Sequence, residues 1–222
     1  MTEAIYAEID KKYADIASTL SEKDKMVLGL AYCPLDGELT RDRIRVRKLY
    51  RKYNLSAPAT MSMDPSDEGD DDSDDIMGVQ RRELLAQIFG LDDEQKHRIE
   101  IEPPFYLDYG YNVKFEGAFY ANSNATILDC AEVTFGHGVL LGPGVHIYAA
   151  THSVNARERD AVLERALPVK IGKNCWIGGN TTIVAGVNIG ENTTIGAGSA
   201  VTKNIPKNCV AVGCPAKVIK YI

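Results

Sequence analysis

The second half of the chain carries an aliphatic residue at every sixth position. This period is held by Ile171, Ile177, Ile183, Ile189, Ile195 and Val201, and an earlier run has it at Ile127, Val133, Val139 and Val145. Glycine directly follows most members of the later run, and a compact residue lies four positions after them. A six-residue repeat supplies one short strand and one turn, and three repeats close a triangular coil. We therefore predict that residues 100–222 form a left-handed parallel β-helix with the aliphatic side chains stacked inside.

A glycine-rich β-sandwich is the alternative fold for such a sequence. Its strands would alternate apolar and polar residues with a period of two, and its turns would be irregularly spaced. The unbroken period of six over residues 171–201 disfavours that alternative. The predicted fold class is therefore mainly β, a β-helix of hexapeptide repeats preceded by helices.

Residues 1–54 have the residue spacing of helices. Apolar residues three or four positions apart are Ile5, Ile9, Tyr13, Ile16 and Leu20, which predicts a helix over residues 2–20. Ser21 and Asp24 resemble a capping box that begins a second helix, and Pro34 ends it. A third helix is predicted from the stripe Leu39, Val46, Leu49, Tyr50 and Tyr53. We expect these residues to form an N-terminal helical subdomain.

An acidic segment separates this subdomain from the repeats. Residues 61–75 contain eight Asp or Glu and no Lys or Arg, so the net charge of −6 arises there and the rest of the chain is slightly basic. With few large apolar side chains, residues 55–78 are predicted to be a disordered insertion. Residues 79–99 are predicted to hold a short helix and a linker. The charge pattern indicates no nucleic-acid partner.

Cysteine usage and apolar runs bear on the compartment. The five cysteines are an odd number and include no Cys-x-x-Cys pair, which argues against a disulfide framework or a zinc site and favours a reducing compartment. No apolar run approaches the roughly 20 residues of a membrane span. The first residues are charged and lack the apolar stretch of a secretory signal. We expect a cytoplasmic protein without membrane attachment.

The six-residue period fails between the two runs. Residues 151–168, with the sequence THSVNARERDAVLERALP, form a charged excursion. A long loop leaving a regular repeat is often functional, and His152 opens this one. A lone histidine in a loop is more often a surface residue, but this position makes His152 a candidate catalytic residue. The other three histidines are expected to be exposed or to point out of the coil: His97, His137 and His146.

Several blocks of the chain, in order, are similar to those of one known family. SEKDKMVLGLAYCPLDGEL, RVRKLYRKYN and PPFYLDYGYN precede the repeats. FYANSNATILD, HIYAATHSVN, KIGKNCWIGGNTTIVAGVNIGENTTIGAGSAVTKNIP and VAVGCPAKVIK follow. Together they resemble the maltose and galactoside O-acetyltransferases of the hexapeptide-repeat acyltransferase superfamily. The resemblance covers residues from about 22 to 220, while the predicted helix 2–20 and the acidic insertion lie outside it.

The resemblance implies a homotrimer that transfers an acetyl group from acetyl-CoA to a hydroxyl of maltose, glucose or a related glycoside, with no metal required. It implies that His152 is the general base and that Asn122 lies at the reacting centre. It places Asp108, Asn122 and Asp129 near the acceptor. Glu164 joins them because its spacing from His152 matches that of an acid in the maltose branch. The galactoside branch has a serine in place of Asp108 and a second acid in place of Cys130. Both differences indicate the maltose branch.

The family's contacts to CoA also have counterparts in this chain. By resemblance they are Gly179, Ala197, Thr202, Lys203, Lys217 and Lys220. Small residues allow the pantetheine arm to approach closely, and lysines can meet the phosphates as point charges. The resemblance also implies active sites between neighbouring coils of the trimer. Trp176, in the block CWIGG, is expected to pack against the next subunit.

Three other functions are weighed against sugar acetylation. The same fold could acetylate an amino acid or an antibiotic hydroxyl, although the helical residues 22–54 belong to the sugar branch. A metal-dependent β-helix enzyme, such as a γ-type carbonic anhydrase, would need a closer histidine pair than the spacings of nine and six in this chain. A non-catalytic scaffold is disfavoured by His152 and by the CoA blocks.

Overall fold

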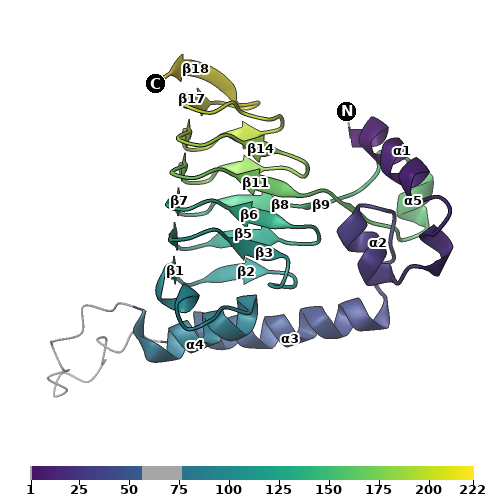
Figure 1. Cartoon of the computed structure of the whole chain (residues 1–222), viewed down its shortest axis with the longest axis horizontal. Helices are drawn as coiled ribbons and strands as arrows, with labels where there is room; N and C mark the ends of the chain where they lie inside the picture. Colours follow the sequence, from purple (N-terminus) through teal and green to yellow (C-terminus); the bar gives the residue numbers. More distant parts are fainter. Residues whose placement is uncertain (1, 57–76) are drawn as a thin grey trace, which may run out of the picture.

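The computed structural model describes residues 2–56 and 77–222, so most of the predicted acidic insertion lies outside the described residues. The repeats form a prism of three parallel sheets, with the helices below it and to one side (Figure 1). The predicted left-handed parallel β-helix is confirmed. The sequence period explains it, because each sheet takes one strand from each coil.

Each face of the prism is one sheet. The seven-stranded sheet contains β1 (Ile99–Ile101), β4 (Phe119–Ala121), β7 (Val139–Leu141), β12 (Trp176–Ile177), β15 (Thr194–Ile195), β17 (Cys209–Val212) and β18 (Lys217–Tyr221). The five-stranded sheet contains β2 (Phe105–Leu107), β5 (Ala125–Leu128), β8 (His146–Tyr148), β13 (Thr182–Ile183) and β16 (Ala200–Val201). The four-stranded sheet contains β3 (Val113–Phe115), β6 (Val133–Phe135), β11 (Val169–Ile171) and β14 (Asn188–Ile189).

The register places the repeated aliphatic residues above one another. Ile177 pairs with Ile195, and Ile183 pairs with Val201, so equivalent positions in these coils are eighteen residues apart. Every aliphatic residue of both six-residue runs is at most 2% exposed. The inward stacking is therefore confirmed, and it gives the coil a continuous apolar core.

Two features of the turns explain their composition. Asn174 and Asn192 have φ of +55°, a left-handed conformation that asparagine tolerates better than most residues. Their side-chain amides also join successive coils, because Asn174 Nδ2 donates to Asn192 Oδ1 at 3.2 Å. Gly172 is needed for a different reason: a Cβ there would lie 2.6 Å from the backbone nitrogen of Glu191 in the next coil.

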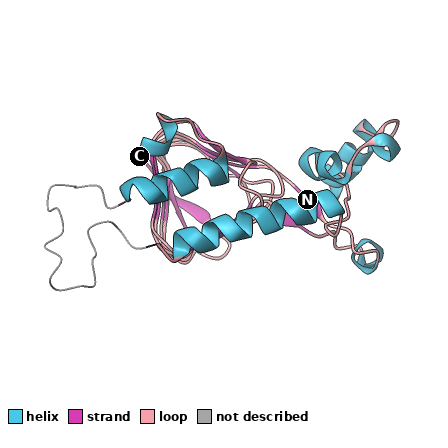
Figure 2. Cartoon of the chain, turned by 90° about the horizontal axis from the view of Figure 1, so that it is seen from below, coloured by secondary structure: helices cyan, strands magenta, loops and turns pink. Residues whose placement is uncertain are grey.

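Helices close the lower end of the prism. Figure 2, seen from below, shows α3 (Gly37–Asn54) and α4 (Gly78–Phe89) side by side under the first coil. The predicted stripe of α3 is confirmed, since Leu39, Val46 and Tyr53 are fully buried. The Tyr53 hydroxyl donates to the carbonyl of Ile101, which ties α3 to β1. At the other end, β18 folds back antiparallel on β17 (Figure 1).

The N-terminal elements lie beside the prism: α1 (Thr2–Lys12), the 3₁₀ turn η1 (Ala17–Thr19) and α2 (Glu22–Leu28). The cap at Ser21 is confirmed, because its side chain accepts from the Asp24 N–H at 3.1 Å. The single helix over 2–20 is wrong. α1 ends at Lys12, Ile16 is 47% exposed, and the residue that α1 buries most deeply is Tyr6. The spacing rule identified a helical face but missed the larger aromatic side chain beside it.

The charged excursion leaves the prism on the same side (Figure 1). It begins with β9 (Ala150–Thr151), contains α5 (Ala156–Asp160) and returns through β10 (Arg165–Ala166), which pairs antiparallel with β9. A 3₁₀ turn, η2 (Gln95–His97), links α4 to the first coil. In the described parts of the chain, no helix has the length and apolar character to cross a bilayer.

Candidate active site

A pocket of about 300 Å³ opens where the excursion leaves the coil. Its walls come from the ends of β5 and β8, from the turns that follow β2 and β5, from β9 and from the residue before β10. The lining residues are Asp108, Leu128, Cys130, Tyr148, Ala150, Thr151, His152 and Glu164. Three residues predicted from the sequence, namely Asp108, His152 and Glu164, therefore lie around one pocket although they are far apart in the chain.

The imidazole of His152 faces the carboxylate of Glu164. His152 Nε2 lies 4.0 Å from Glu164 Oε1, and the His152 side chain is 55% exposed. The two atoms are too far apart to be hydrogen-bonded to each other. An oxygen atom about 2.8 Å from both would fit between them, since those three distances form a possible triangle. The arrangement can therefore hold a hydroxyl group beside a base and next to a negative charge.

Tyr32, which the sequence did not single out, holds Glu164 in place. The Tyr32 hydroxyl donates to Glu164 Oε2 at 2.8 Å, and the backbones of the two residues exchange N–H to carbonyl hydrogen bonds of 3.0 Å in both directions. Burial raises the pKa of the Tyr32 phenol, so it stays protonated and remains a donor. The contact spans 132 positions of the chain. No local pattern in the sequence could have indicated it.

Asp129 supports the pocket from beneath. Its carboxylate is fully buried and accepts from the N–H groups of Asp108 at 3.1 Å, Tyr109 at 2.8 Å and Gly110 at 2.7 Å. Burial raises the pKa of Asp129 to about 7, and the N–H groups of Tyr109 and Gly110 act in the opposite direction. The side chain does not line the pocket. Its geometry favours a role in shaping the turn that carries Asp108.

Asp108 itself reaches the pocket wall. Burial raises the pKa of its carboxyl, and the charge of Arg47, whose Nη2 lies 3.9 Å from Asp108 Oδ1, acts in the opposite direction. The Cys130 thiol donates to Asp108 Oδ2 at 3.7 Å. Burial also raises the pKa of Cys130, so its thiol stays neutral and is unsuited to act as a nucleophile.

Asn122 lies on a different edge of the prism from His152. It follows β4 and precedes β5, so it occupies the edge between the seven- and five-stranded sheets. His152 follows β8 and β9 and occupies the edge between the five- and four-stranded sheets. The Asn122 amide donates to the Tyr120 hydroxyl at 3.1 Å within its own chain. One chain therefore does not bring these two predicted residues together.

Four of the six predicted CoA residues divide between the same two edges. Gly179 and Ala197 follow β12 and β15 on the Asn122 edge, whereas Thr202 and Lys203 follow β16 on the His152 edge. A groove of about 360 Å³ runs along the His152 edge. Its lining residues are Ile5, Val184, Ala185, Gly186, Val187, Thr202, Lys203 and Asn204. Lys217 and Lys220 are exposed on β18.

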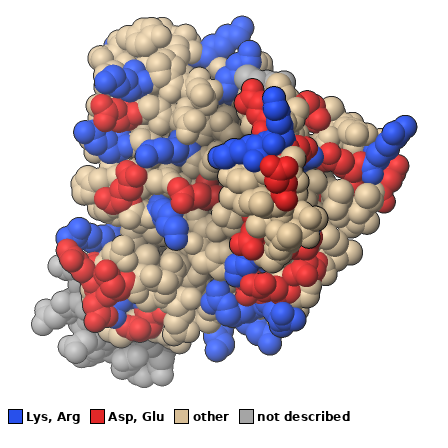
Figure 3. All heavy atoms as spheres, turned by 45° about the vertical axis from the view of Figure 1, so that its right-hand side comes forward, with Lys and Arg blue, Asp and Glu red and all other residues tan. Residues whose placement is uncertain are grey.

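The remaining histidines fit their predicted places. His97 and His137 are exposed, and His137 Nδ1 accepts from the Ala118 N–H at 3.2 Å. His146 on β8 alternates with the fully buried Ile147, so it faces outward. Within residues 2–56 and 77–222, no three His, Cys, Asp or Glu side chains form a group that could hold a metal ion. The surface seen in Figure 3 mixes acidic and basic side chains.

Two family models match the chain. A model described as the maltose acetyltransferase hexapeptide capping motif matches residues 25–91, and one described as the hexapeptide repeat of succinyl-transferase matches residues 168–203. The first covers α3 and α4 at the lower end of the prism, and the second covers the regular coils. Residues 2–24, which include α1, lie outside both matches.

Individual proteins show the same likeness. A Saccharomyces cerevisiae protein, named a "putative acetyltransferase", is 52% identical over 187 residues, which is 84% of this chain and 87% of its own. The crystal structure of a maltose O-acetyltransferase from Clostridium difficile is 39% identical with a TM-score of 0.76, covering 91% of this chain and 98% of its own. A galactoside acetyltransferase structure is 32% identical with a TM-score of 0.73, covering 91% and 92%. The chain is therefore a hexapeptide-repeat acetyltransferase and belongs to the maltose and galactoside O-acetyltransferase family.

Proposed function

We propose that this protein transfers the acetyl group of acetyl-CoA to a hydroxyl of a sugar, with His152 as the general base. The observation that carries the proposal is the pocket in which the His152 imidazole and the carboxylates of Asp108 and Glu164 meet. A sugar presents several hydroxyl groups close together. A base for one of them and two carboxylate acceptors for its neighbours match that chemistry.

His152 carries the proton through the reaction. Its imidazole takes the proton of the acceptor hydroxyl as the oxygen attacks the thioester carbonyl. The imidazolium then returns the proton to the CoA sulfur as the carbon–sulfur bond breaks, so the products are the acetyl ester and free CoA. The Glu164 carboxylate, 4.0 Å from Nε2, stabilises the positive charge that His152 holds between these steps. The neutral Cys130 thiol takes no part, and no acetylated enzyme is formed.

Acetyl-CoA is proposed as the donor because related structures hold it and the edges of this prism suit it. One solved relative, a Vibrio cholerae hexapeptide-repeat acetyltransferase that is 27% identical, was determined in complex with acetyl-CoA. In this chain the groove beside Thr202 and Lys203 is lined by apolar residues and by the exposed Lys203. That combination suits a pantetheine arm and a phosphate group. Lys217 and Lys220 are proposed to meet the nucleotide end.

A homotrimer is proposed because the predicted site residues of one chain lie on two separate edges of its prism. Asn122, Gly179 and Ala197 lie on one edge of the prism, and His152, Thr202 and Lys203 lie on another. Packing three prisms around a common axis would set one edge of each against the other edge of its neighbour. Each of the three sites would then take His152 from one subunit and Asn122 from the next.

An acceptor screen tests the proposed activity. Purified protein is incubated with acetyl-CoA and, in parallel, with maltose, glucose, a galactoside, serine or chloramphenicol, and thiol release is followed. We expect release with one or more of the sugars, and release at least about a hundredfold slower with His152→Ala. Thiol release with serine or chloramphenicol alone would overturn the sugar assignment while leaving acetyl transfer intact.

A further inference from the structure

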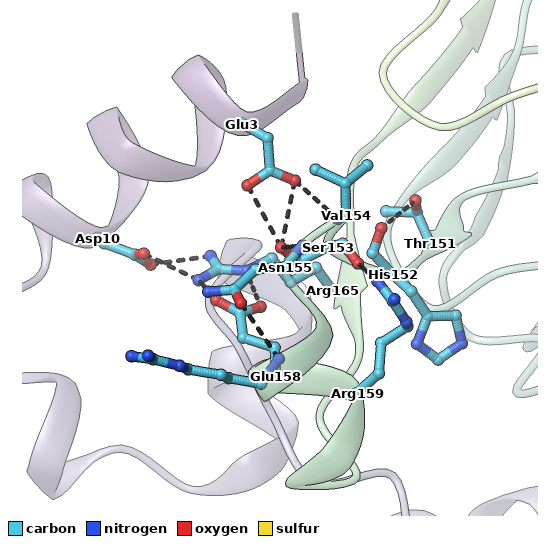
Figure 4. A network of polar contacts seen from close by, with 11 residues as sticks. Glu3, Asp10, Thr151, His152, Ser153, Val154, Asn155, Glu158, Arg159 and Arg165 are labelled. Atoms are coloured by element: carbon cyan, nitrogen blue, oxygen red, sulfur yellow. Dashed lines mark hydrogen bonds and ion pairs between the residues drawn. The ribbon is translucent and has the colours of Figure 1, made fainter.

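The mechanism above leaves α1 without a role, although α1 lies against the excursion that carries His152. Figure 4 shows the helix on one side of this loop and the imidazole of His152 on the other. Its buried face is small, because Tyr6 packs with Leu167 and Ala185, and Ile9 is only partly buried. Most of its specific contacts with the excursion are polar. They fall at the two strands of the excursion's neck, immediately beside the pocket.

The first contact is made by Glu3 at the residue after His152. The Ser153 hydroxyl donates to Glu3 Oε1 and Oε2 at 3.2 and 3.3 Å, and the Val154 N–H donates to Glu3 Oε1 at 3.0 Å. Ser153 is only 2% exposed. Because Ser153 follows His152 directly, the carboxylate fixes the backbone from which the imidazole projects.

The second contact is made by Asp10 at the residue after Glu164. Arg165 Nη1 and Nη2 donate to the two Asp10 oxygens at 2.9 and 2.8 Å, a bidentate pair. The same guanidinium donates through Nε and Nη2 to Glu158 of α5, both at 2.9 Å. The Tyr6 ring lies 4.8 Å from its central carbon. Only 5% of the Arg165 side chain is exposed, so this charge depends on its two carboxylates.

Both contacts bear on the separation between His152 and Glu164. Thr151, just before His152, is paired in the β9–β10 ladder with Arg165, just after Glu164. Glu3 therefore holds one strand of the neck on the far side of His152, and Asp10 holds the other strand beside Glu164. A shift of either strand would change the 4.0 Å separation between His152 Nε2 and Glu164 Oε1.

We propose that Glu3 and Asp10 are positioning residues that hold His152 and Glu164 in register across the pocket, so that α1 is part of the active-site scaffold. This inference rests on the proposed role of His152. It extends the site to a helix that lies outside the residues matched by both family models. Neither carboxylate touches the substrates, and each acts through the backbone of the neck.

Point variants test this better than removal of the helix, because Ile5 of α1 also lines the groove beside Thr202 and Lys203. Glu3→Ala removes the acceptor for Ser153 and Val154. Glu3→Gln keeps one oxygen, which can still accept from both groups, and should restore most of the loss. Glu8→Ala is the matched control, because Glu8 lies on the same helix and is exposed.

The measurements are kcat, the KM for acetyl-CoA and hydrogen exchange of the amides in residues 152–166, on the full-length protein well below its melting temperature. For Glu3→Ala we expect kcat to fall about ten- to a hundredfold, the effect of a small misplacement of a catalytic group. The KM for acetyl-CoA should change less than about threefold, because the contacts that bind acetyl-CoA in the ground state are not altered. Exchange at residues 152–155 should be at least about tenfold faster, since the Val154 N–H loses its acceptor. Asp10→Ala should likewise lower kcat and speed up amide exchange, in this case at residues 164–166.

Two results would overturn the inference. One is a Glu3→Ala protein with wild-type kcat and wild-type exchange. The other is an equal loss in Glu8→Ala, which would show that only the charge of the helix matters. If the wild-type protein acetylates no sugar, the proposed function fails, but the exchange experiment still decides whether α1 holds the loop. Should Asp10→Ala not fold, Glu3→Ala and Glu3→Gln carry the test, because Glu3 is an exposed residue.

Discussion

His152 stands at the surface, yet residues from three distant parts of the chain determine its surroundings. The Tyr32 hydroxyl donates to Glu164 opposite the imidazole. Asp129 accepts from the turn that carries Asp108, and Glu3 accepts from the backbone after His152. The imidazole could be predicted from the sequence because it opens an excursion within a regular repeat. Its supporting contacts could not, because they join residues 19 to 151 positions apart and leave no local spacing to detect.

The general base gives the first prediction at this scale. His152→Ala should lower kcat by roughly 10²- to 10⁴-fold, the range for a lost general base. Binding of CoA, measured by calorimetry, should persist, because the imidazole is not proposed to hold the cosubstrate. His137→Ala is the control, since His137 lies in a turn away from the pocket. A His152→Ala protein with kcat within a few-fold of wild type would remove the proposed mechanism.

The buried carboxylate of Asp129 gives the second prediction at this scale. Asp129→Ala should lower the free energy of unfolding by about 3 kcal/mol, because three N–H groups lose a fully buried acceptor. Urea denaturation measures this, with Asp15→Ala as the surface control. The variant should also lose activity, since the turn that carries Asp108 is released. Unchanged stability would mean that water replaces the carboxylate.

At the scale of elements, the coil was more predictable than the helices around it. The six-residue period is intrinsic to the sequence, so the inward positions of β11 to β16 could be read directly. α1 was harder, because adjacent apolar residues compete for one buried face and the excursion selects Tyr6 over Ile5. The partners of Tyr6 are Leu167, Ala185 and Arg165, and Arg165 lies 159 positions from it in the chain. Local spacing predicts a helical face but not its partner.

The strand β18 carries a prediction about the cosubstrate. Lys217→Ala combined with Lys220→Ala should raise the KM for acetyl-CoA roughly two- to thirtyfold, since exposed charged contacts contribute about 0.2–1 kcal/mol each. The kcat should change little, because these contacts are remote from the thioester. Lys48→Ala with Lys52→Ala removes the same charge from α3 and serves as the control. An unchanged KM in the β18 variant would exclude both lysines from the site.

At the scale of the whole molecule, the outer face of the seven-stranded sheet carries two exposed large apolar side chains. Trp176 is 56% exposed, and its ladder partner Leu140 is 49% exposed. Two neighbouring large apolar side chains on a flat face are typical of a surface that another chain covers. This observation supports the proposed trimer independently of the division of site residues between two edges.

The trimer leads to a prediction that links assembly to activity. The wild-type protein should scatter light as three chains, and Trp176→Glu with Leu140→Glu should shift the population toward smaller species and reduce thiol release in parallel. Leu35→Glu, at another exposed apolar residue, should leave both unchanged. A wild-type protein that is monomeric and fully active would contradict both the trimer and the shared site.

A stack of parallel coils has an uncovered coil at each end, and the backbone N–H and C=O groups there can pair with a strand from another molecule. In this chain both ends differ from a bare parallel coil. α3 and α4 lie under the first coil (Figure 2), and the last strand at the other end is β18, which runs antiparallel to β17 and carries Lys217 and Lys220. Because neither end presents an uncharged parallel coil, end-to-end stacking into fibres is disfavoured. Association is left to the flat sides, where a rotation that closes on itself yields a finite ring.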